Sequence, residues 1–404
     1  MAMLSLPRLP RSVMPGGMTG LVFLLPPVLG LLAKLWRSRR WFGDYQAVAC
    51  AGQKVLAHQP VYDFGLNCGG MHASVYVYIP AVAQFAAFCQ KLIGGDGFFF
   101  LYLLLFALSV GGLIFVPLLS KAAPGIWRDK LPFTVFLSGS AIMWGNIAVI
   151  LHAATMMAAL VLETAPWLFV AAVVVAAWVK PVFLTYLIVA LIADMPPARR
   201  AAMAVSGVAA GLLPTFVYMT IGGDEARAWF TVLSHFVYVQ TPGYGVLGWL
   251  ADAGIHGDGV VAKAVYLVYA FALGLSGVIV AEGLRLDGRS RLWLGLTLAA
   301  LMIPRIMSQD MFLLGPGLWL LARTAAERLD GGLARQAPAL MLILCGVALL
   351  GGLTGTGSWL IPAALAGLSG MIVALAWVTV RDRVSHFSAF ALAWLRRDQR
   401  QATE

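Results

Sequence analysis

Long apolar runs, separated by short breaks that contain charged residues, glycine or proline, follow one another along almost the whole chain. A helix that crosses a bilayer needs about 20 mostly apolar residues, so these runs predict about twelve transmembrane helices. The strands of a membrane barrel would instead alternate apolar and polar residues. We therefore expect an all-α, polytopic membrane protein with spans near residues 18–36, 73–92, 98–119, 131–143, 146–162, 167–195, 201–222, 260–283, 292–304, 308–322, 338–353 and 357–380.

Interruptions of the apolar pattern define how the chain is organised. Residues 131–162 could form two half-helices, and residues 167–195 could form one helix kinked at Pro181 or two separate segments. Two connecting segments are long, about 37–72 and 223–259, and the others are short. No segment outside the predicted spans is long enough to fold as a soluble domain.

The end of the chain has a different pattern. The transmembrane domain is expected to occupy residues 1–380, and residues 381–404 form a basic cytoplasmic tail. Between residues 381 and 397, apolar side chains recur every three or four positions with arginines between them. This spacing predicts an amphipathic helix that lies at the membrane surface and anchors the tail there.

Composition agrees with a membrane protein and excludes a soluble or disordered chain. Of the 404 residues, 61% are hydrophobic and 11% are charged, whereas a soluble domain carries about 25% charged residues. A net charge of +10 would suggest nucleic-acid binding in a soluble chain, but here cytoplasmic loops and anionic lipid headgroups explain it. Arg8 and Arg11 precede an apolar run without a small-residue cleavage site, which predicts an uncleaved first helix.

Arginine in the short loops predicts the orientation of the chain, because cytoplasmic loops carry an excess of lysine and arginine. With twelve spans, the basic loops of the second half all lie on the cytoplasmic side, as do both termini. The two long loops then face the periplasm. Two basic groups conflict with this topology, so either a span in the first half is miscounted or these bases bind an anion such as a lipid headgroup. The conflicting groups are Lys34, Arg37, Arg39 and Arg40, and Lys121, Arg128 and Lys130.

Two of the four cysteines flank the first long loop. If that loop is periplasmic, Cys50 and Cys68 could form a disulfide, and otherwise they remain free thiols. The same loop contains apolar residues at helical spacing over 45–57, which predicts a short amphipathic helix along the membrane surface. Asp44 precedes this helix and could be its N-cap, or it could be a general base held at the boundary between water and lipid.

Further charged residues interrupt apolar runs later in the chain. Lys180 is costly in a bilayer unless it faces a cavity or a partner, or reaches the interface with its long side chain. Arg305 and Asp310 flank a tight turn and are either paired with each other or exposed to a ligand. The planar guanidinium of arginine suits a phosphate group.

The second long loop interleaves aromatic and amide side chains with His235, which could bind sugars or lie on lipid headgroups. His235 and His256 have no partner at metal-ligand spacing, and no Asp-x-Asp pair occurs. We therefore expect neither a metal nor another cofactor.

The order of these motifs is similar to that of a known family. The chain resembles glycosyltransferase family 87, the polyprenyl-phosphate-mannose-dependent mannosyltransferase type of the GT-C superfamily, over about residues 40 to 320. The late turn departs from the Trp-x-His form of the mycobacterial mannosyltransferases, and Gln309 replaces the tyrosine of a Pro-Arg…Tyr-Asp variant. The sugar and the acceptor therefore stay open. The matching motifs are Asp44-Tyr45, the Pro-Val-Tyr-Asp run of Pro60–Asp63, Tyr78–Pro80, Gly145-Asn146, Lys180-Pro181 and Pro304–Asp310.

The resemblance implies a GT-C fold in the bacterial inner membrane, with a periplasmic active site. It implies that Asp44 removes a proton from an acceptor hydroxyl, which attacks a polyprenyl-phosphate sugar with inversion and without a metal. Mannose is the favoured sugar, and the acceptor would be a glycolipid, a polysaccharide or a protein. The resemblance further implies that Arg305, Lys180 and Arg40 bind the donor phosphate, and that Tyr45, Tyr78, Asn146, His235, Gln309 and Asp310 contact the substrates.

Two other classes of protein compete with this interpretation. A secondary transporter or flippase would also use Lys180 and broken helices, although no internal repeat relates the two halves of the chain. A membrane scaffold would explain neither Asp44 nor the turn between Arg305 and Asp310.

Overall fold

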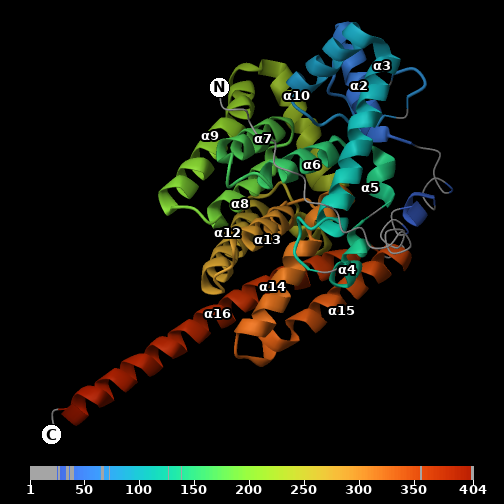
Figure 1. Ribbon diagram of the computed structural model, residues 1–404. Coiled ribbons are helices and arrows are strands. Elements are labelled where there is room, and N and C mark those ends of the chain that lie inside the picture. Colours follow the sequence, from blue (N-terminus) through green and yellow to red (C-terminus); the bar gives the residue numbers. More distant parts are fainter. Residues whose placement is uncertain are drawn as a thin grey trace, which may run out of the picture.

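The computed structural model describes residues 25, 28–32, 36, 41–64, 68–71, 73–125, 127–137, 139–354 and 357–401, and all of its regular elements are helices. Within these residues no strand occurs, so the predicted helical class is confirmed. Figure 1 gives the arrangement, and η denotes 3₁₀ and π segments. The elements are α2 (Gly43–Leu56), α3 (Pro80–Ile114), η1 (Phe115–Leu119), α4 (Trp127–Lys130), η2 (Leu131–Phe136), α5 (Gly139–Trp144), α6 (Ile147–Ala159), α7 (Pro166–Val179), η3 (Pro181–Tyr186), α8 (Leu187–Ile192), α9 (Pro197–Ile221), α10 (Gly223–Ser234), η4 (His235–Gln240), α11 (Val246–Asp252), α12 (Val260–Gly283), α13 (Gly288–Leu301), η5 (Ser308–Leu313), α14 (Gly315–Arg328), α15 (Gly332–Thr354) and α16 (Gly357–Gln401).

Five of the described helical segments are long and apolar enough to cross a bilayer. Their outward faces carry large apolar side chains, such as Phe216, Phe271 and Leu104, that are 57% exposed or more. Since water would penalise such a surface, the chain is a helical membrane protein. The five segments are Pro80–Leu119, Pro197–Ile221, Val260–Gly283, Gly332–Gly352 and Trp359–Val384.

Arginine side chains tie the helices together at one end of the bundle. Arg200 and Arg291 each bind the carboxylate of Glu282 at 2.7 Å, which joins α9, α12 and α13. Arg289 donates to the carbonyl of Ala122 at 2.7 Å. Three further contacts lie here: Arg323 pairs with Asp129, Arg328 donates to the carbonyl of Leu284, and Arg383 donates to the carbonyl of Gly283. We call this end of the bundle the arginine end.

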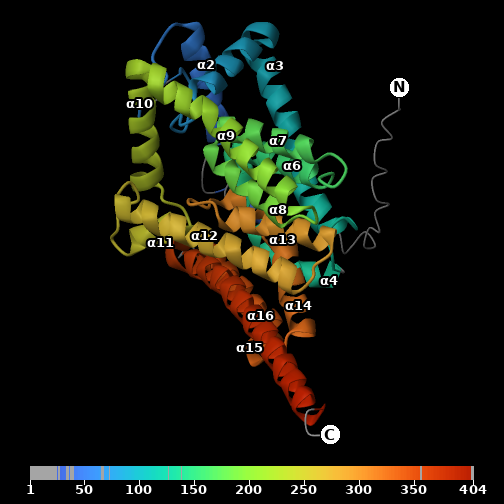
Figure 2. The same cartoon turned by 90° about the vertical axis from the view of Figure 1, so that its left-hand side faces the viewer.

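The two long segments between predicted spans meet at the opposite end. Trp229 of α10 donates through Nε1 to the carbonyl of Val77 at 3.1 Å, and His235 packs edge-on against Phe64. We call this end, with α2, α10, α11 and the turn at 303–307, the loop end. Figure 2 shows α2 and α10 far from the C-terminus, towards which α16 extends. The segment 223–259, expected as a loop, is largely helical in α10, η4 and α11.

The first half of the predicted topology is corrected at α3. Residues 73–92 and 98–119 were expected to form two spans, but Pro80–Leu119 is a single candidate span, in which two helical stretches meet at a kink at Gly94, where φ is +75°. Consequently the following segment lies at the arginine end, where Lys130 is close to Arg289. The bases near residues 121–130 therefore lie at the same end as the other arginines, as a miscounted span in the first half would predict.

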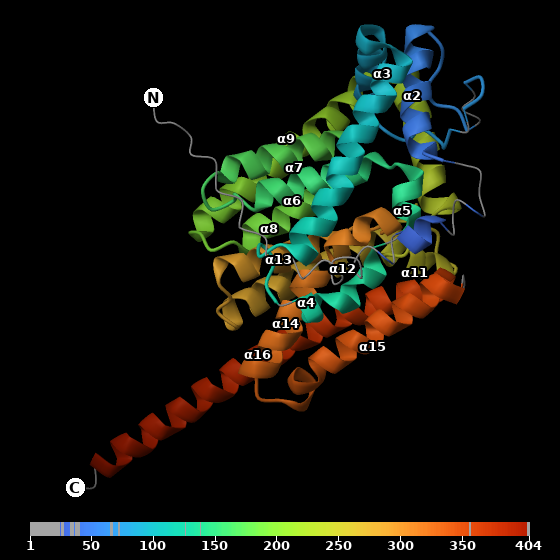
Figure 3. The same cartoon turned by 45° about the vertical axis from the view of Figure 1, so that its right-hand side comes forward.

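Several helices of the bundle are too short to cross a bilayer. Helices α6, α7, α13 and α14 have 13 or 14 residues, which corresponds to about 20 Å each. Residues 167–195 form two segments that meet at Lys180-Pro181, because Pro181 cannot continue the hydrogen bonding of α7. Helices α6 and α7 lie side by side (Figure 3). The start of α6 and the end of α7 meet inside the bundle, where Asn146 accepts from Lys180.

Two predicted segments lie partly outside the described residues. Most of the expected span 18–36 lies outside the described residues, as do Arg37, Arg39 and Arg40. The tail continues α16 as a helix to Gln401. The side chains on which its predicted amphipathic pattern depends are also outside the description.

Candidate functional site

Asp44 lies in the first turn of α2 and does not cap it. The N-cap is Phe42, whose backbone adopts the left-handed conformation (φ 55°), so the prediction that Asp44 is the cap is wrong. The helix itself is confirmed, because α2 covers Gly43–Leu56. Asp44 is half-buried, and its carboxylate is turned towards the start of α6, where it meets Asn146.

The approach of these two elements depends on Gly145. A Cβ at this position would lie 2.7 Å from the Phe42 ring, and its φ of +60° favours glycine. Phe42 also donates through its backbone N–H to Met143 at 2.9 Å. The Gly-Asn motif at 145–146 therefore lets the chain before α6 pack against the chain before Asp44.

Asn146 connects Asp44 to Lys180. Its Nδ2 donates to Asp44 Oδ2 at 2.6 Å, and its Oδ1 accepts from Lys180 Nζ at 2.8 Å. The same Oδ1 accepts from the backbone N–H of Ala148 at 2.9 Å, so Asn146 is the N-cap of α6. One amide thus fixes a carboxylate and an ammonium on either side of the start of a helix.

Lys180 also contacts an aromatic ring of the chain just before α3. Its Nζ lies 5.4 Å from the centre of the Tyr78 ring, within the range of a cation–π interaction. Tyr78 is buried. Burial raises the pKa of the Tyr78 hydroxyl, and the nearby charge of Asp44 raises it further. Of the alternatives for Lys180, the structure therefore supports a lysine that has partners inside the bundle.

Arg305 is held by the second long segment. Its Nε donates to the carbonyl of Thr241 and its Nη2 to the Thr241 hydroxyl. The guanidinium lies 5.1 Å from the centre of the Phe236 ring. Gly243 permits this approach, because a Cβ there would lie 2.6 Å from the Ile306 carbonyl. Burial lowers the pKa of Arg305 and the carboxylate of Asp310 opposes this shift, but an arginine stays charged in proteins.

Asp310 is bound to a histidine and makes no salt bridge to Arg305. His152 Nε2 lies 2.8 Å from Asp310 Oδ1, and His152 Nδ1 lies 2.5 Å from the hydroxyl of Tyr186. The other oxygen of Asp310 accepts from the backbone N–H of Met307 at 2.8 Å. His152 and Tyr186 are fully buried. Neither residue was predicted from the sequence, although a histidine within an apolar helix is itself a signal of a polar site.

The charges of this cluster lie within electrostatic range of one another. Lys180 interacts with the carboxylates of Asp310 and Asp44 and with the guanidinium of Arg305. Lys180 and Arg305 are both only partly buried, as is Asp44. Two cations and two carboxylates therefore share one region of the bundle, and three of them retain exposed surface with which a ligand could interact.

Other predicted site residues do not join the cluster. Tyr45 packs among Phe98, Phe99 and Tyr102 and is buried. Burial raises the pKa of its hydroxyl to about 12. His235 is exposed and contacts Phe64.

The two remaining residues gain no role from the structure. Gln309 is buried beside Asp310, and its amide makes no hydrogen bond among the described residues. Arg40 lies outside the description.

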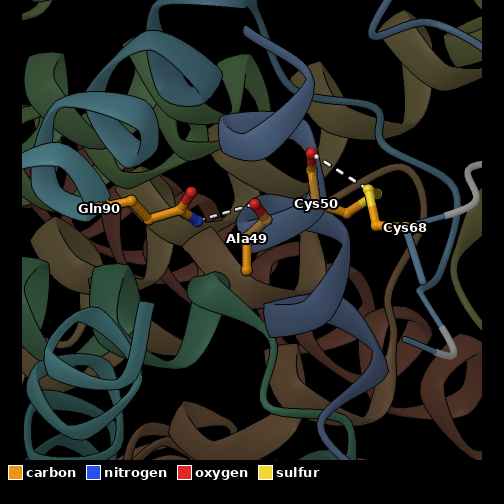
Figure 4. The surroundings of a disulfide bond; sticks show 4 residues. All are labelled: Ala49, Cys50, Cys68 and Gln90. Atoms are coloured by element: carbon orange, nitrogen blue, oxygen red, sulfur yellow. Dashed lines mark hydrogen bonds between the residues drawn. A yellow bond between two sulfur atoms is a disulfide. The ribbon is translucent and has the colours of Figure 1, made fainter. Parts of the chain in front are cut away.

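A disulfide fastens the first long segment to α2. Cys50 is bonded to Cys68 (Figure 4), so of the two predicted alternatives the structure has the disulfide. On the opposite side of α2, Gln90 of α3 donates to the carbonyl of Ala49 at 2.8 Å. Both contacts limit the motion of the helix whose first turn carries Asp44.

This arrangement suits the binding of an anion next to a general base. Lys180 and Arg305 supply positive charge, and one oxygen of Asp44 has no hydrogen bond within the described residues. No group of three or more His, Cys, Asp or Glu side chains in the described part could hold a metal ion. Comparisons with protein-family models, with curated proteins and with solved structures gave no match.

Proposed function

We propose that this protein is a membrane glycosyltransferase that moves a sugar from a polyprenyl-phosphate donor to an acceptor hydroxyl. The observation that carries the proposal is the hydrogen-bonded chain Asp44–Asn146–Lys180. The Asn146 amide donates to the Asp44 carboxylate at 2.6 Å and accepts from the Lys180 ammonium at 2.8 Å. Such a transfer needs both a base and a cation, because the acceptor hydroxyl loses a proton and the phosphate leaves the anomeric carbon with a negative charge.

In the proposed reaction, Asp44 accepts the proton of the acceptor hydroxyl. The acceptor oxygen then forms a bond to the anomeric carbon while the bond between that carbon and the phosphate oxygen breaks. The electron pair of the broken bond leaves with the polyprenyl phosphate, and Lys180 and Arg305 stabilise its charge. Because attack and departure occur on opposite faces, the configuration inverts.

The resemblance to glycosyltransferase family 87 supports the same reaction. The motifs that carry it supply Asp44, Tyr78, Asn146, Lys180 and Arg305, all of which belong to the cluster. On this basis we propose a GT-C fold, with fewer spans than the twelve expected, because Pro80–Leu119 is a single candidate span. Mannose remains the favoured sugar, and a glycolipid, a polysaccharide or a protein remains the acceptor.

We propose that the site faces the periplasm of a bacterial inner membrane. The arginine end fits the cytoplasmic side, where basic residues accumulate. The disulfide Cys50–Cys68 lies at the loop end, and disulfides persist in oxidising compartments such as the periplasm. Charge and redox chemistry therefore favour the same orientation.

A transporter or flippase of an anionic lipid-linked substrate is the second candidate. The observation in its favour is the break at Lys180-Pro181, where two short segments end inside the bundle. Transporters use such discontinuous helices to bind their substrates. This candidate predicts movement of the donor without chemical change.

The test uses membranes that contain the wild type, the Asp44→Asn variant or no added protein. Each is supplied with a panel of labelled polyprenyl-phosphate sugars and a crude extract of envelope acceptors, and mass spectrometry follows donor and product. Consumption of one donor by the wild type alone supports the proposal and identifies the sugar. Movement of an unchanged donor across the bilayer would support the transporter instead, and equal consumption by the wild type and Asp44→Asn would remove Asp44 as the base.

A further inference from the structure

A concave site lies at the arginine end, away from the cluster around Asp44. It is a cavity of about 320 Å³ between the end of α6, the end of α8 and the start of α13. Its inner wall is apolar and includes Val189, Leu162 and Trp293, which are at most 3% exposed. Met157, also in the lining, is 42% exposed, so the cavity adjoins the apolar outer surface of the bundle.

Charged groups of both signs line the same cavity. Glu163, Asp194 and Arg289 contribute to its wall, and all three are exposed. Gly288 lies beside both residues, since a Cβ there would lie 2.2 Å from Glu163 Oε1 and 3.9 Å from Asp194 Cβ. Gly288 therefore leaves room for the Glu163 carboxylate at the wall of a cavity that Asp194 and Arg289 also line.

The hydrogen bonds of these groups leave capacity for a ligand. Arg289 uses Nε on the carbonyl of Ala122, and no other hydrogen bond of its guanidinium occurs within the described residues. Neither Glu163 nor Asp194 has a hydrogen bond or ion pair in that part of the chain. The carboxylates can thus still accept from N–H donors of a ligand, and the guanidinium can still bind an oxyanion.

We infer that this cavity binds one phospholipid of the surrounding bilayer whose headgroup carries both a phosphate and a primary ammonium, as in phosphatidylethanolamine. An acyl chain fills the apolar interior, the phosphate accepts from Arg289, and the ammonium donates to Glu163 and Asp194. An anionic headgroup has no ammonium to donate to the two carboxylates. A trimethylammonium headgroup has no N–H to donate to them.

The inference is tested on the full-length protein reconstituted in nanodiscs that contain equal amounts of phosphatidylethanolamine, phosphatidylcholine and phosphatidylglycerol. Native mass spectrometry after transfer to detergent measures which lipid stays bound. We expect the wild type to retain phosphatidylethanolamine about tenfold more often than phosphatidylcholine, since the ammonium makes charge-assisted hydrogen bonds.

Three variants separate the contributions. Glu163→Gln with Asp194→Asn should remove the preference between the two zwitterionic lipids, and Leu292→Trp should reduce retention of every lipid by filling the cavity. The matched control is Arg323→Gln, an exposed arginine at the same end that pairs with Asp129 and Glu327 outside the cavity. Thermal unfolding verifies that each variant is folded.

Two results would overturn the inference. One is that the wild type retains no lipid, or retains all three lipids alike. The other is that the folded double variant of Glu163 and Asp194 keeps the preference of the wild type. Neither result bears on the proposed sugar transfer, because no residue of this cavity belongs to the cluster around Asp44.

Discussion

The carboxylate of Asp44 and the amide of Asn146 are joined by a hydrogen bond of 2.6 Å although 102 positions separate them in the chain. Asp44 lies in the first turn of α2 at the loop end, and Asn146 is the N-cap of the short helix α6. Because Asn146 also accepts from Lys180, a change at this contact affects both charged groups at once.

The packing of Gly145 against Phe42 should be essential for that contact. Gly145→Ala introduces a Cβ 2.7 Å from the Phe42 ring at a φ of +60°, so we expect a loss of stability of about 2–4 kcal/mol. Thermal unfolding in detergent measures it. Gly346→Ala is the matched control, because a Cβ there meets nothing within 4 Å. Equal melting temperatures for the two variants would contradict the packing argument.

His152 should stabilise the turn that carries Asp310. His152→Phe keeps a ring of similar size but leaves Asp310 and Tyr186 without their shared partner. Buried polar groups without partners cost about 1–3 kcal/mol each, so the variant should unfold at a clearly lower temperature and lose transfer activity. His235→Phe, at an exposed position, should leave stability unchanged. A His152→Phe protein as stable as the wild type would refute this role.

Arg305 should not be replaceable by lysine. The guanidinium binds Thr241 through two of its nitrogens, and a lysine cannot keep those bonds while it also reaches a phosphate. If Arg305 binds the donor, Arg305→Lys should raise the KM for the donor about tenfold. Initial rates over a range of donor concentrations measure this. Arg227→Lys, a highly exposed arginine at the loop end, is the control, and an unchanged KM in Arg305→Lys would exclude Arg305 from the phosphate site.

Lys130 should make stability depend on pH. It is buried and donates to the carbonyls of Ser120 and Ala123, and burial together with the charge of Arg289 lowers its pKa from 10.5 to about 8. Between these two values the unfolded chain binds more protons than the folded protein, so stability rises with pH across this window. The cost of the buried charge is fully present below about pH 8.

The comparison with Lys130→Met isolates this effect from other titrating groups. Melting temperatures are measured at several pH values from about 7 to about 10, and the wild type should gain about 2 °C or more relative to the variant over that range. Parallel curves for the two proteins would mean that Lys130 titrates as in the unfolded chain.

Much of the helical architecture could be predicted because apolar runs are a local property of the sequence. The break at Lys180-Pro181 was among the predicted alternatives, since proline stops helical hydrogen bonding wherever it occurs. The kinked run Pro80–Leu119 was divided into two spans instead, because a glycine-rich kink and a loop between helices have the same composition. That division also assigned the bases near Lys130 to the wrong side of the bundle.

The site could be predicted only in part, because its contacts join residues far apart in the chain. The motifs singled out Asp44, Asn146, Lys180 and Arg305, but nothing local indicates that Asn146 joins the first and the third. Asp44 was expected to be a helix cap, and the left-handed backbone of Phe42 that takes this position has no sequence signal. His152 was missed because its partner lies 158 positions away.

The central claim is that Asp44 acts as the base of a sugar transfer, and the most direct test compares donor binding with turnover in purified protein. Asp44→Asn keeps the size and part of the hydrogen bonding of the side chain but cannot accept the proton. We therefore expect turnover to fall by about 10²- to 10⁴-fold while the Kd for the donor stays unchanged. Asp96→Asn, an exposed acid on the neighbouring helix α3, should retain wild-type turnover. An Asp44→Asn enzyme that binds the donor and turns over at the rate of the wild type would contradict the account.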